Sequence, residues 1–291
     1  MYPHSPRARR ESPQVYRVRR AVALTIVVLL LYGILRVVGL VGGGGGGGES
    51  AGTTSSSTTS TTIPDPPACT TGDVVVQEDP LAHWQTVVVD TERRLPEGFA
   101  PNDLVNIAEA GFPFTDGLAV REILLVDLNA MREAAAANGT PISILAAYRS
   151  YEQQQALKER RVEQLGPEVA AGRVAEPGHS EHQLGTTIDV TSEGQTDVDQ
   201  AWGASPAGQW IASNAHKYGF LLSYPSGASG RTCYDYEPWH LRYVGRELAQ
   251  RVVASGLTLR HYLFVHHPPL GYDPAAEPDT TTTTDEVVTE G

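Results

Sequence analysis

A stretch of 21 residues, 42–62, separates the N-terminal part of this chain from the part that can form a hydrophobic core. The stretch consists of eight Gly, eleven Ser or Thr, one Ala and one Glu. It has almost no apolar side chain to bury, so it predicts a flexible linker. We assign residues 42–68 to this linker, 69–268 to one folded domain and 269–291 to a disordered acidic, Thr-rich tail. A domain of that length can bury a sizeable hydrophobic core.

An apolar run lies before the linker. Residues 21–41 contain a single charge, Arg36, and a helix of about 20 residues spans the hydrocarbon core of a membrane. Residues 1–20 carry six Arg and one Glu, and clustered basic residues stay in the cytoplasm. We therefore expect a cytoplasmic tail, one transmembrane helix in the cell membrane and an extracytoplasmic domain. A cleavable signal peptide is the alternative, but the run is long for one and lacks a small-x-small cleavage signal.

Charge excludes one class of partner. From Ile63 onward the chain has 15 Lys or Arg and 32 Asp or Glu. Gripping a nucleic-acid backbone needs clustered cations, so nucleic acid is not expected as a partner.

The chain has two cysteines, Cys69 and Cys233. Outside the cytoplasm such a pair is expected to form a disulfide. The bridge would connect the start of the domain to the segment that leads into Glu237.

Periodicity and turn residues outline the elements of the domain. Helices are expected where apolar residues recur at helical spacing or a capping signal begins the segment, at 118–138, 150–165, 205–219 and 245–255. Strands are expected at 141–147, 186–191, 220–224 and 236–243, and residues 166–185 are rich in Gly and Pro and predict a loop. Because no regular βαβ alternation is visible, the expected class is α+β, with a mainly antiparallel central sheet flanked by helices.

Two segments contain several residues of the types that bind metal ions. The first runs from Gly178 to Asp189 and the second is Tyr236-Glu237-Pro238-Trp239-His240. A hydrolytic Zn²⁺ takes three His, Asp or Glu ligands and leaves one position open for water. His182, Asp189 and His240 supply that set, and Gly185 allows the chain to turn between the first two.

Glu237 lies three residues before His240. Pro238 favours an extended backbone at Glu237, so the two side chains need not share a face. This placement favours a general base acting beside the metal over a fourth ligand.

These segments resemble the signature of VanY-type D-alanyl-D-alanine carboxypeptidases, in the LAS group of zinc metallopeptidases. The resemblance covers roughly residues 81–257 and rests on three motifs: Ser180-x-His182-x-x-Gly185-x-Thr187-x-Asp189, Glu237-x-Trp239-His240, and upstream Tyr148-Arg149-Ser150-Tyr151-Glu152-Gln153-Gln154. Thr187 stands where the group has Ala, at a position that holds no ligand.

The resemblance implies a role for each matching residue. His182, Asp189 and His240 would bind zinc, and Glu237 would be the general base for a metal-activated water. Arg149 would stabilise the oxyanion, with Ser180 and Gln154 contacting the substrate. The implied substrate is the peptidoglycan stem peptide, trimmed at its D-Ala-D-Ala end.

The residues independently support the role of Arg149. It follows a strand that is expected to be buried, so a rigid element would hold its guanidinium group toward a developing anion. A surface Arg at a helix start would instead oppose the helix dipole.

Two alternatives remain open at this point. An L,D-carboxypeptidase or a peptidoglycan endopeptidase would use the same chemistry, since the pocket loops and not the ligands choose the substrate. A non-catalytic zinc-containing cell-wall-binding module belongs to another class. Such a module has no use for Glu237 beside an open metal position, and a fourth protein ligand would favour it.

Overall fold

The computed structural model describes residues 63–113 and 117–273. The expected cytoplasmic tail, the expected transmembrane helix (21–41) and residues 42–62 of the linker lie outside these residues. Within the described ranges, no helix is both long enough and apolar enough to cross a membrane.

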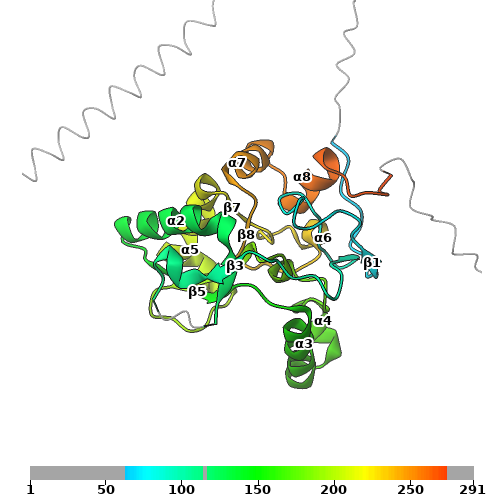
Figure 1. The fold of residues 1–291 in the computed structure, drawn as a ribbon, viewed down its shortest axis with the longest axis horizontal. Helices are drawn as coiled ribbons and strands as arrows, with labels where there is room; N and C mark the ends of the chain where they lie inside the picture. The colour runs from blue at the N-terminus through cyan, green and yellow to red at the C-terminus, as the bar shows by residue number, and fades with distance from the viewer. Residues whose placement is uncertain (1–62, 114–116, 274–291) are drawn as a thin grey trace, which may run out of the picture. The chain divides into compact units, whose positions relative to one another are not determined.

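A four-stranded antiparallel sheet forms the centre of the domain (Figure 1). Its order is β5 (Ile142–Ala146), β6 (Thr187–Ser192), β8 (His240–Tyr243) and β7 (Phe220–Leu222). Each neighbouring pair runs antiparallel. The expected α+β class with an antiparallel sheet is therefore confirmed.

One face of this sheet is apolar. Side chains alternate between the two faces of a strand, and the apolar members of β6 and β8 belong to one buried cluster, namely Ile188, Val190, Leu241 and Tyr243. Helices α2 (Leu125–Ala137) and α5 (Pro206–Asn214) contribute Leu128, Met131 and Ile211, all fully buried, to the same cluster. Asp189, between Ile188 and Val190, and its pairing partner His240, next to Leu241, therefore face away from this core.

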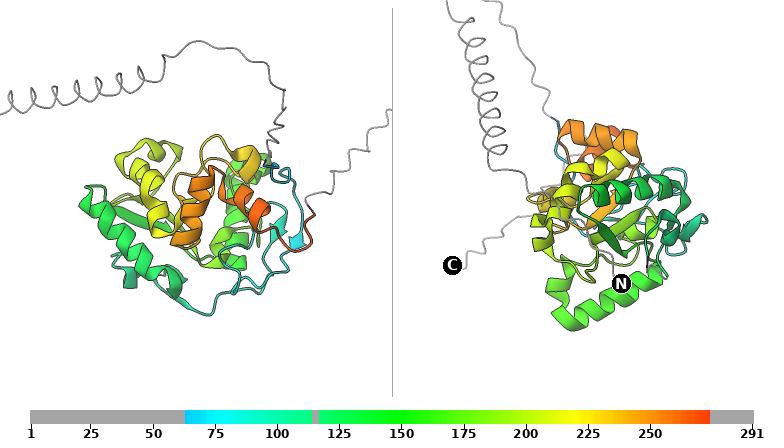
Figure 2. Two further views of the ribbon diagram at one scale, coloured as in Figure 1. Left: turned by 90° about the horizontal axis from the view of Figure 1, so that it is seen from above. Right: turned by 90° about the vertical axis from the view of Figure 1, so that its left-hand side faces the viewer.

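The helices outside this core lie at two ends of the domain. Helix α3 (Tyr151–Leu165) and helix α4 (Pro167–Ala171) lie together at one end, and α7 (Arg246–Ser255) and α8 (Leu259–His266) lie at the opposite end (Figures 1 and 2). The predicted capping box starts α3: the Ser150 side chain accepts from the Gln153 N–H, and the Gln153 side chain accepts from the Ser150 N–H.

The remaining elements are short. Strand β1 (Val74–Val75) pairs in parallel with β2 (Arg93–Arg94), and β3 (Leu104–Asn106) pairs antiparallel with β4 (Ala119–Arg121). The single-turn helix α6 (Ser229–Thr232) precedes the expected second segment of the site. Turns of 3-10 helix cover Ile107–Ala110, Glu122–Leu124, Glu181–Leu184, Gln200–Ala204 and Ala215–Tyr218.

Four expectations about these elements differ from the structure. Where a helix is expected from residue 118, residues 119–121 instead form β4, because they pair with β3. The α-helix starts only at Leu125. The helix expected to residue 219 ends at Asn214 and continues as a 3-10 turn. The loop 166–185 contains α4 and a 3-10 turn. The strand expected from residue 236 starts only at His240.

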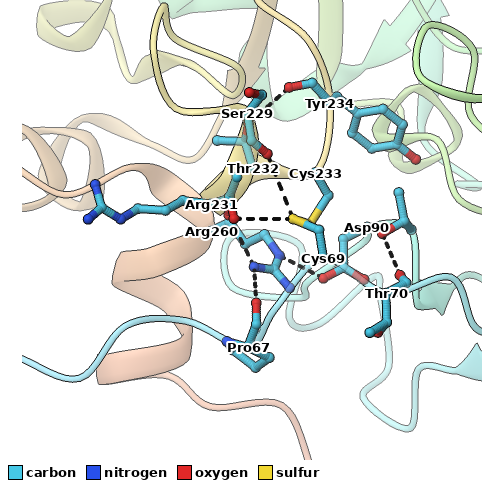
Figure 3. Close-up of a disulfide and its surroundings, with 12 residues drawn as sticks. Pro67, Cys69, Thr70, Asp90, Ser229, Arg231, Thr232, Cys233, Tyr234 and Arg260 are labelled. Carbon is cyan, nitrogen blue, oxygen red and sulfur yellow. Dashed lines mark hydrogen bonds and ion pairs between the residues drawn. A yellow bond between two sulfur atoms is a disulfide. The ribbon is translucent and has the colours of Figure 1, made fainter.

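Residues near the start of the described chain are attached to α8 and to the residue that follows α6 (Figure 3). Cys69 and Cys233 form a disulfide, as expected. The Arg260 guanidinium group on α8 donates to the Pro67 carbonyl at 3.0 Å and pairs with the buried Asp90 carboxylate at 2.8 Å. Residues 63–68, which composition assigns to the linker, thus contact the folded domain.

Candidate metal centre and active-site cleft

Two of the expected zinc ligands are placed by strand pairing. Asp189 of β6 and His240 of β8 are direct partners in the antiparallel register. Side chains of such partners lie on the same face of the sheet at close range. The Asp189 Oδ1 atom is 3.5 Å from the His240 Nδ1 atom.

The third expected ligand reaches the same point from the turn before β6. His182 lies in the 3-10 turn Glu181–Leu184, and Gly185 ends that turn with φ +70°. This left-handed conformation suits glycine. The chain then reverses into β6, which brings the His182 Nε2 atom to 3.4 Å from the Asp189 Oδ1 atom.

Hydrogen bonds orient both imidazole rings. The His182 Nδ1 atom is 2.7 Å from the Ala147 carbonyl oxygen, and the His240 Nε2 atom is 2.9 Å from the Glu181 Oε2 atom. When each ring is neutral, this nitrogen donates to its acceptor, so the other ring nitrogen carries the free lone pair. Those lone pairs belong to His182 Nε2 and His240 Nδ1, the two atoms that face Asp189.

These three residues fit a zinc ion. One ligand atom of each lies within 4.8 Å of the others. The buried Asp189 Oδ1 atom has no hydrogen-bond partner, which is costly for a carboxylate unless a cation lies beside it. Two neutral imidazoles and one carboxylate are a common ligand set for catalytic zinc.

Burial and charge act differently on the two histidines. Burial lowers the pKa of His182, against the opposing effect of the Asp189 carboxylate. Burial also lowers the pKa of His240, but its contacts with the negatively charged Asp189 and Glu181 carboxylates outweigh burial and raise the value to about 10. Zinc binding therefore requires His240 to release a proton.

Glu237 lies beside this group without belonging to it. Its Oε2 atom is 3.4 Å from His240 Nδ1. The Glu237 N–H donates to the Tyr224 carbonyl oxygen at 3.1 Å, which holds the segment in place. Burial raises the pKa of Glu237 to about 7, with the positive charge of His240 acting in the opposite direction. A carboxylate with a pKa near neutrality is suited to accept and return a proton.

The three residues implied by the resemblance lie around the same point. Arg149, Gln154 and Ser180 line one cleft with the three expected ligands. The Arg149 guanidinium group donates to Gln154 Oε1 at 2.7 Å, and the Gln154 amide donates to the Ala175 carbonyl oxygen at 2.7 Å. Burial lowers the pKa of Arg149, whereas the negative charges of Asp189 and Glu237 raise it. Their expected catalytic and binding roles stay predictions.

The cleft continues past the metal position. The first cleft has a volume of about 470 Å³, and an adjoining one of about 440 Å³ shares Arg173, Glu237 and Trp239 with it. The residues that line the first cleft include three arginines, Arg149, Arg161 and Arg173. The site therefore lies along a groove rather than at the bottom of a closed pocket.

Two residues at this site were not singled out by the sequence. Glu181 lies within the first motif at a position that any residue could fill, and its role becomes visible only through its contact with His240. Tyr224 follows β7 and packs its ring 4.6 Å from the His240 ring. No motif includes Tyr224, because its place depends on the pairing of β7 with β8.

Comparisons with known proteins agree with this geometry. A family model described as VanY, D-alanyl-D-alanine carboxypeptidase, matches residues 117–246. The protein YodJ of Bacillus subtilis (strain 168) is 36% identical over 179 residues, which are 60% of this chain and 65% of YodJ. A D-alanyl-D-alanine carboxypeptidase of Enterococcus faecalis (strain ATCC 700802 / V583) is 33% identical over 140 residues, which are 45% of this chain and 50% of that protein. The chain thus spans less than two thirds of each of these curated relatives.

Two solved structures are similar to this chain in fold, and one of them contains Zn(II). The LdcB LD-carboxypeptidase is 35% identical with a TM-score of 0.56, covering 61% of this chain and 84% of that one. A mutant of the vancomycin resistance D,D-pentapeptidase VanY in complex with Zn(II) is 27% identical with a TM-score of 0.53, covering 62% of this chain and 99% of that one.

Proposed function

The chain belongs to the VanY D-alanyl-D-alanine carboxypeptidase family of zinc-dependent peptidases, and from this premise we propose that it removes the terminal D-Ala from peptidoglycan stem peptides. One observation carries the proposal. The ligand atoms of His182, Asp189 and His240 converge within 4.8 Å, and the Glu237 carboxylate lies 3.4 Å from His240.

The metal and the protein divide the chemistry between them. Zinc held by the three residues supplies Lewis acidity, which polarises the scissile carbonyl and lowers the pKa of water. Glu237 accepts the proton of the attacking water and passes it to the departing amine, so one carboxylate acts first as base and then as acid.

Arg149 is placed to stabilise the charge that develops on the carbonyl oxygen. Its side chain is half-buried, and Gln154, which is 1% exposed, fixes the direction of the guanidinium group. A donor that is already oriented needs no reorganisation when the oxyanion forms. Ser180, 6% exposed and lining the same cleft, is assigned to substrate contact.

The length of the groove supports a peptide substrate longer than a dipeptide. The two adjoining clefts share Arg173, Glu237 and Trp239 in their walls. A stem peptide that has its terminal residue in one cleft can lay its preceding residues in the other. A relative of known structure is described as bound to D-alanine-D-alanine, which agrees with a D-Ala-D-Ala terminus as the part that is cut.

An L,D-carboxypeptidase is the second candidate. The LdcB LD-carboxypeptidase is 35% identical to this chain, compared with 27% for the D,D-pentapeptidase VanY. The metal ligands and the base would be the same in both activities, so the choice depends on the walls of the groove.

The non-catalytic alternative has no comparable support. Within the described ranges no fourth His, Cys, Asp or Glu joins the three-residue metal group. An open position beside Glu237 agrees with a catalytic site.

We further propose that the peptidase acts outside the cell, anchored by the apolar run at residues 21–41. The supporting observations are that apolar run itself, the basic residues before it and the Cys69–Cys233 disulfide, a bond typical of exported proteins.

Mass spectrometry of muropeptides distinguishes these activities. The purified zinc-loaded protein is incubated separately with pentapeptide, tetrapeptide and cross-linked muropeptides, with Glu237→Gln prepared in parallel to detect contaminating peptidases. Conversion of pentapeptide to tetrapeptide supports the proposal. Conversion of tetrapeptide to tripeptide instead supports the L,D activity, and separation of cross-linked dimers supports an endopeptidase. If none of the three substrates yields a product, the proposed function is overturned.

A further inference from the structure

We propose that Glu181 is a positioning residue that orients the metal ligand His240 and thereby sets the affinity of the site for zinc. This inference rests on the zinc site of the proposed function and adds a residue that none of the motifs assigns. Glu181 contacts neither the metal position nor the cleft, so it would act only through His240.

The contact between the two side chains is direct and buried. Glu181 Oε2 lies 2.9 Å from His240 Nε2, and the residues are 5% and 4% exposed. A hydrogen bond from Nε2 to the carboxylate fixes the proton on that nitrogen, which leaves the Nδ1 lone pair facing Asp189. The Tyr224 ring, 4.6 Å away, packs against the same imidazole. The His240 ring is thus restricted in both rotation and tautomer.

Glu181 is itself held from two further directions. The Ser223 hydroxyl donates to Glu181 Oε2 at 2.6 Å, and the Arg242 guanidinium group donates to Glu181 Oε1 at 3.0 Å. Arg242 is 1% exposed and also donates to the carbonyl oxygens of Trp84 and Val87 at 3.0 and 2.8 Å. The carboxylate therefore has a fixed position relative to β8, which carries both His240 and Arg242.

The ion pair with Arg242 explains how the charged Glu181 carboxylate can be buried. Arg242 compensates the negative charge of Glu181 within the protein interior. Glu181 therefore increases the basicity of His240 through the hydrogen bond without leaving an unpaired charge in the interior.

The two histidine ligands differ in how they are oriented. The Nδ1 atom of His182 donates to a backbone carbonyl, that of Ala147, which no substitution removes. The corresponding acceptor for His240 is a side chain. A substitution at Glu181 therefore tests the contribution of orientation at one ligand while all three ligands remain present.

The test measures zinc affinity, using the purified zinc-stripped protein and competition with a chromogenic chelator. Glu181→Gln keeps the size of the side chain but presents an amide to at least one of its three donors. The double variant Glu181→Met with Arg242→Met removes the acceptor and the ion pair together, so no charge is left unpaired in the core. We expect the zinc dissociation constant to rise about 10- to 100-fold in the double variant, and by less in Glu181→Gln.

Two controls separate orientation from loss of fold. Glu168→Gln, at an exposed position in the first turn of α4, removes the same charge outside this network and should leave zinc affinity unchanged. Thermal unfolding of the metal-free proteins reports whether each variant folds. If the fold is intact, excess zinc should restore most of the activity of the double variant, whereas a misfolded protein would not recover.

Ser223→Ala keeps the test decisive even if both Glu181 variants fail to fold. This variant removes one of the donors that fix the carboxylate and retains the ion pair, so a loss of affinity smaller than about tenfold is expected. Unchanged zinc affinity in the folded Glu181 variants would overturn the inference, as would unchanged affinity in Ser223→Ala if it alone folds. A wild-type protein that binds zinc but hydrolyses no muropeptide would overturn the proposed function only, because zinc affinity is measured without substrate.

Discussion

At the scale of single residues, the proposed mechanism assigns metal binding and proton transfer to different side chains. The three-residue group excludes Glu237, although its carboxylate lies 3.4 Å from a ligand nitrogen. Glu237→Gln should therefore keep zinc and lose about 10²- to 10⁴-fold in kcat, the usual contribution of a general base. His240→Ala should lose zinc and activity together, since two ligands remain.

Zinc content by atomic absorption and release of D-Ala from a pentapeptide test this contrast. Near-normal turnover by Glu237→Gln would disprove its role as the base. Loss of zinc from that variant would show that Glu237 is a ligand.

The environment of Glu237 also predicts the pH dependence of the reaction. A general base works only when it is unprotonated, so activity is lost as the pH falls through its pKa. Burial raises this pKa to about 7, and the positive charge of bound zinc lowers it. The acid limb of kcat/KM should therefore have its midpoint at or below about pH 7.

The profile is to be recorded together with the zinc content at each pH, so that loss of metal is not mistaken for protonation of the base. An acid limb centred well above pH 7 with full zinc occupancy would contradict the assignment.

At the scale of elements, the site depends on the turn that joins His182 to β6. Gly185 has φ +70°, and a Cβ atom built there lies 3.0 Å from both Arg121 Cγ and Leu104 Cδ2. Gly185→Ala should lower the free energy of unfolding by about 1–3 kcal/mol and also weaken zinc binding, because the turn positions His182. Gly194→Ala is the matched control, since Gly194 has φ +83° with no atom within 4 Å of its built Cβ.

Denaturant unfolding and zinc competition measure both effects. The control should show the cost of the backbone strain alone, at about 1 kcal/mol, with normal zinc affinity. Equal effects of the two variants on zinc affinity would contradict the packing argument.

Elements were predictable from sequence where their signals are local. The strand of Ile142–Ala146 and the helix that starts after Ser150 were expected from an apolar run and a capping box. The strand β4 was not, because residues 119–121 gain their partner only when β3 lies beside them. Helix α8 was also missed.

The same distinction holds for the site. The metal-ligating residues occur in short motifs, so their types and spacing indicated the chemistry before any fold was known. Glu181 and Tyr224 act through contacts with His240, on strand β8, 59 and 16 positions away. Only the pairing of β6, β7 and β8 brings these residues together.

At the scale of the whole molecule, a covalent bond and a buried ion pair secure the start of the domain. The disulfide joins residues 164 positions apart, and Asp90 pairs with Arg260 in the interior nearby. Replacing both Cys69 and Cys233 by Ser should lower the free energy of unfolding by about 2–5 kcal/mol.

Thermal unfolding with and without reductant provides the internal control. The reductant should bring the wild-type Tm down to that of the double variant and leave the double variant unchanged. An equal Tm for both proteins under oxidising conditions would show that the bridge adds no stability.

The bridge also sets an order of events in the synthesis of the chain. Cys69 leaves the ribosome long before Cys233, which follows it by 164 positions, so the sulfur atoms cannot meet until most of the domain has been made. Disulfides form in oxidising compartments, and Cys233 begins the segment that leads into Glu237. If the domain is exported as its sequence predicts, we expect a newly made chain to gain its full hydrolytic capacity only after it has left the cytoplasm.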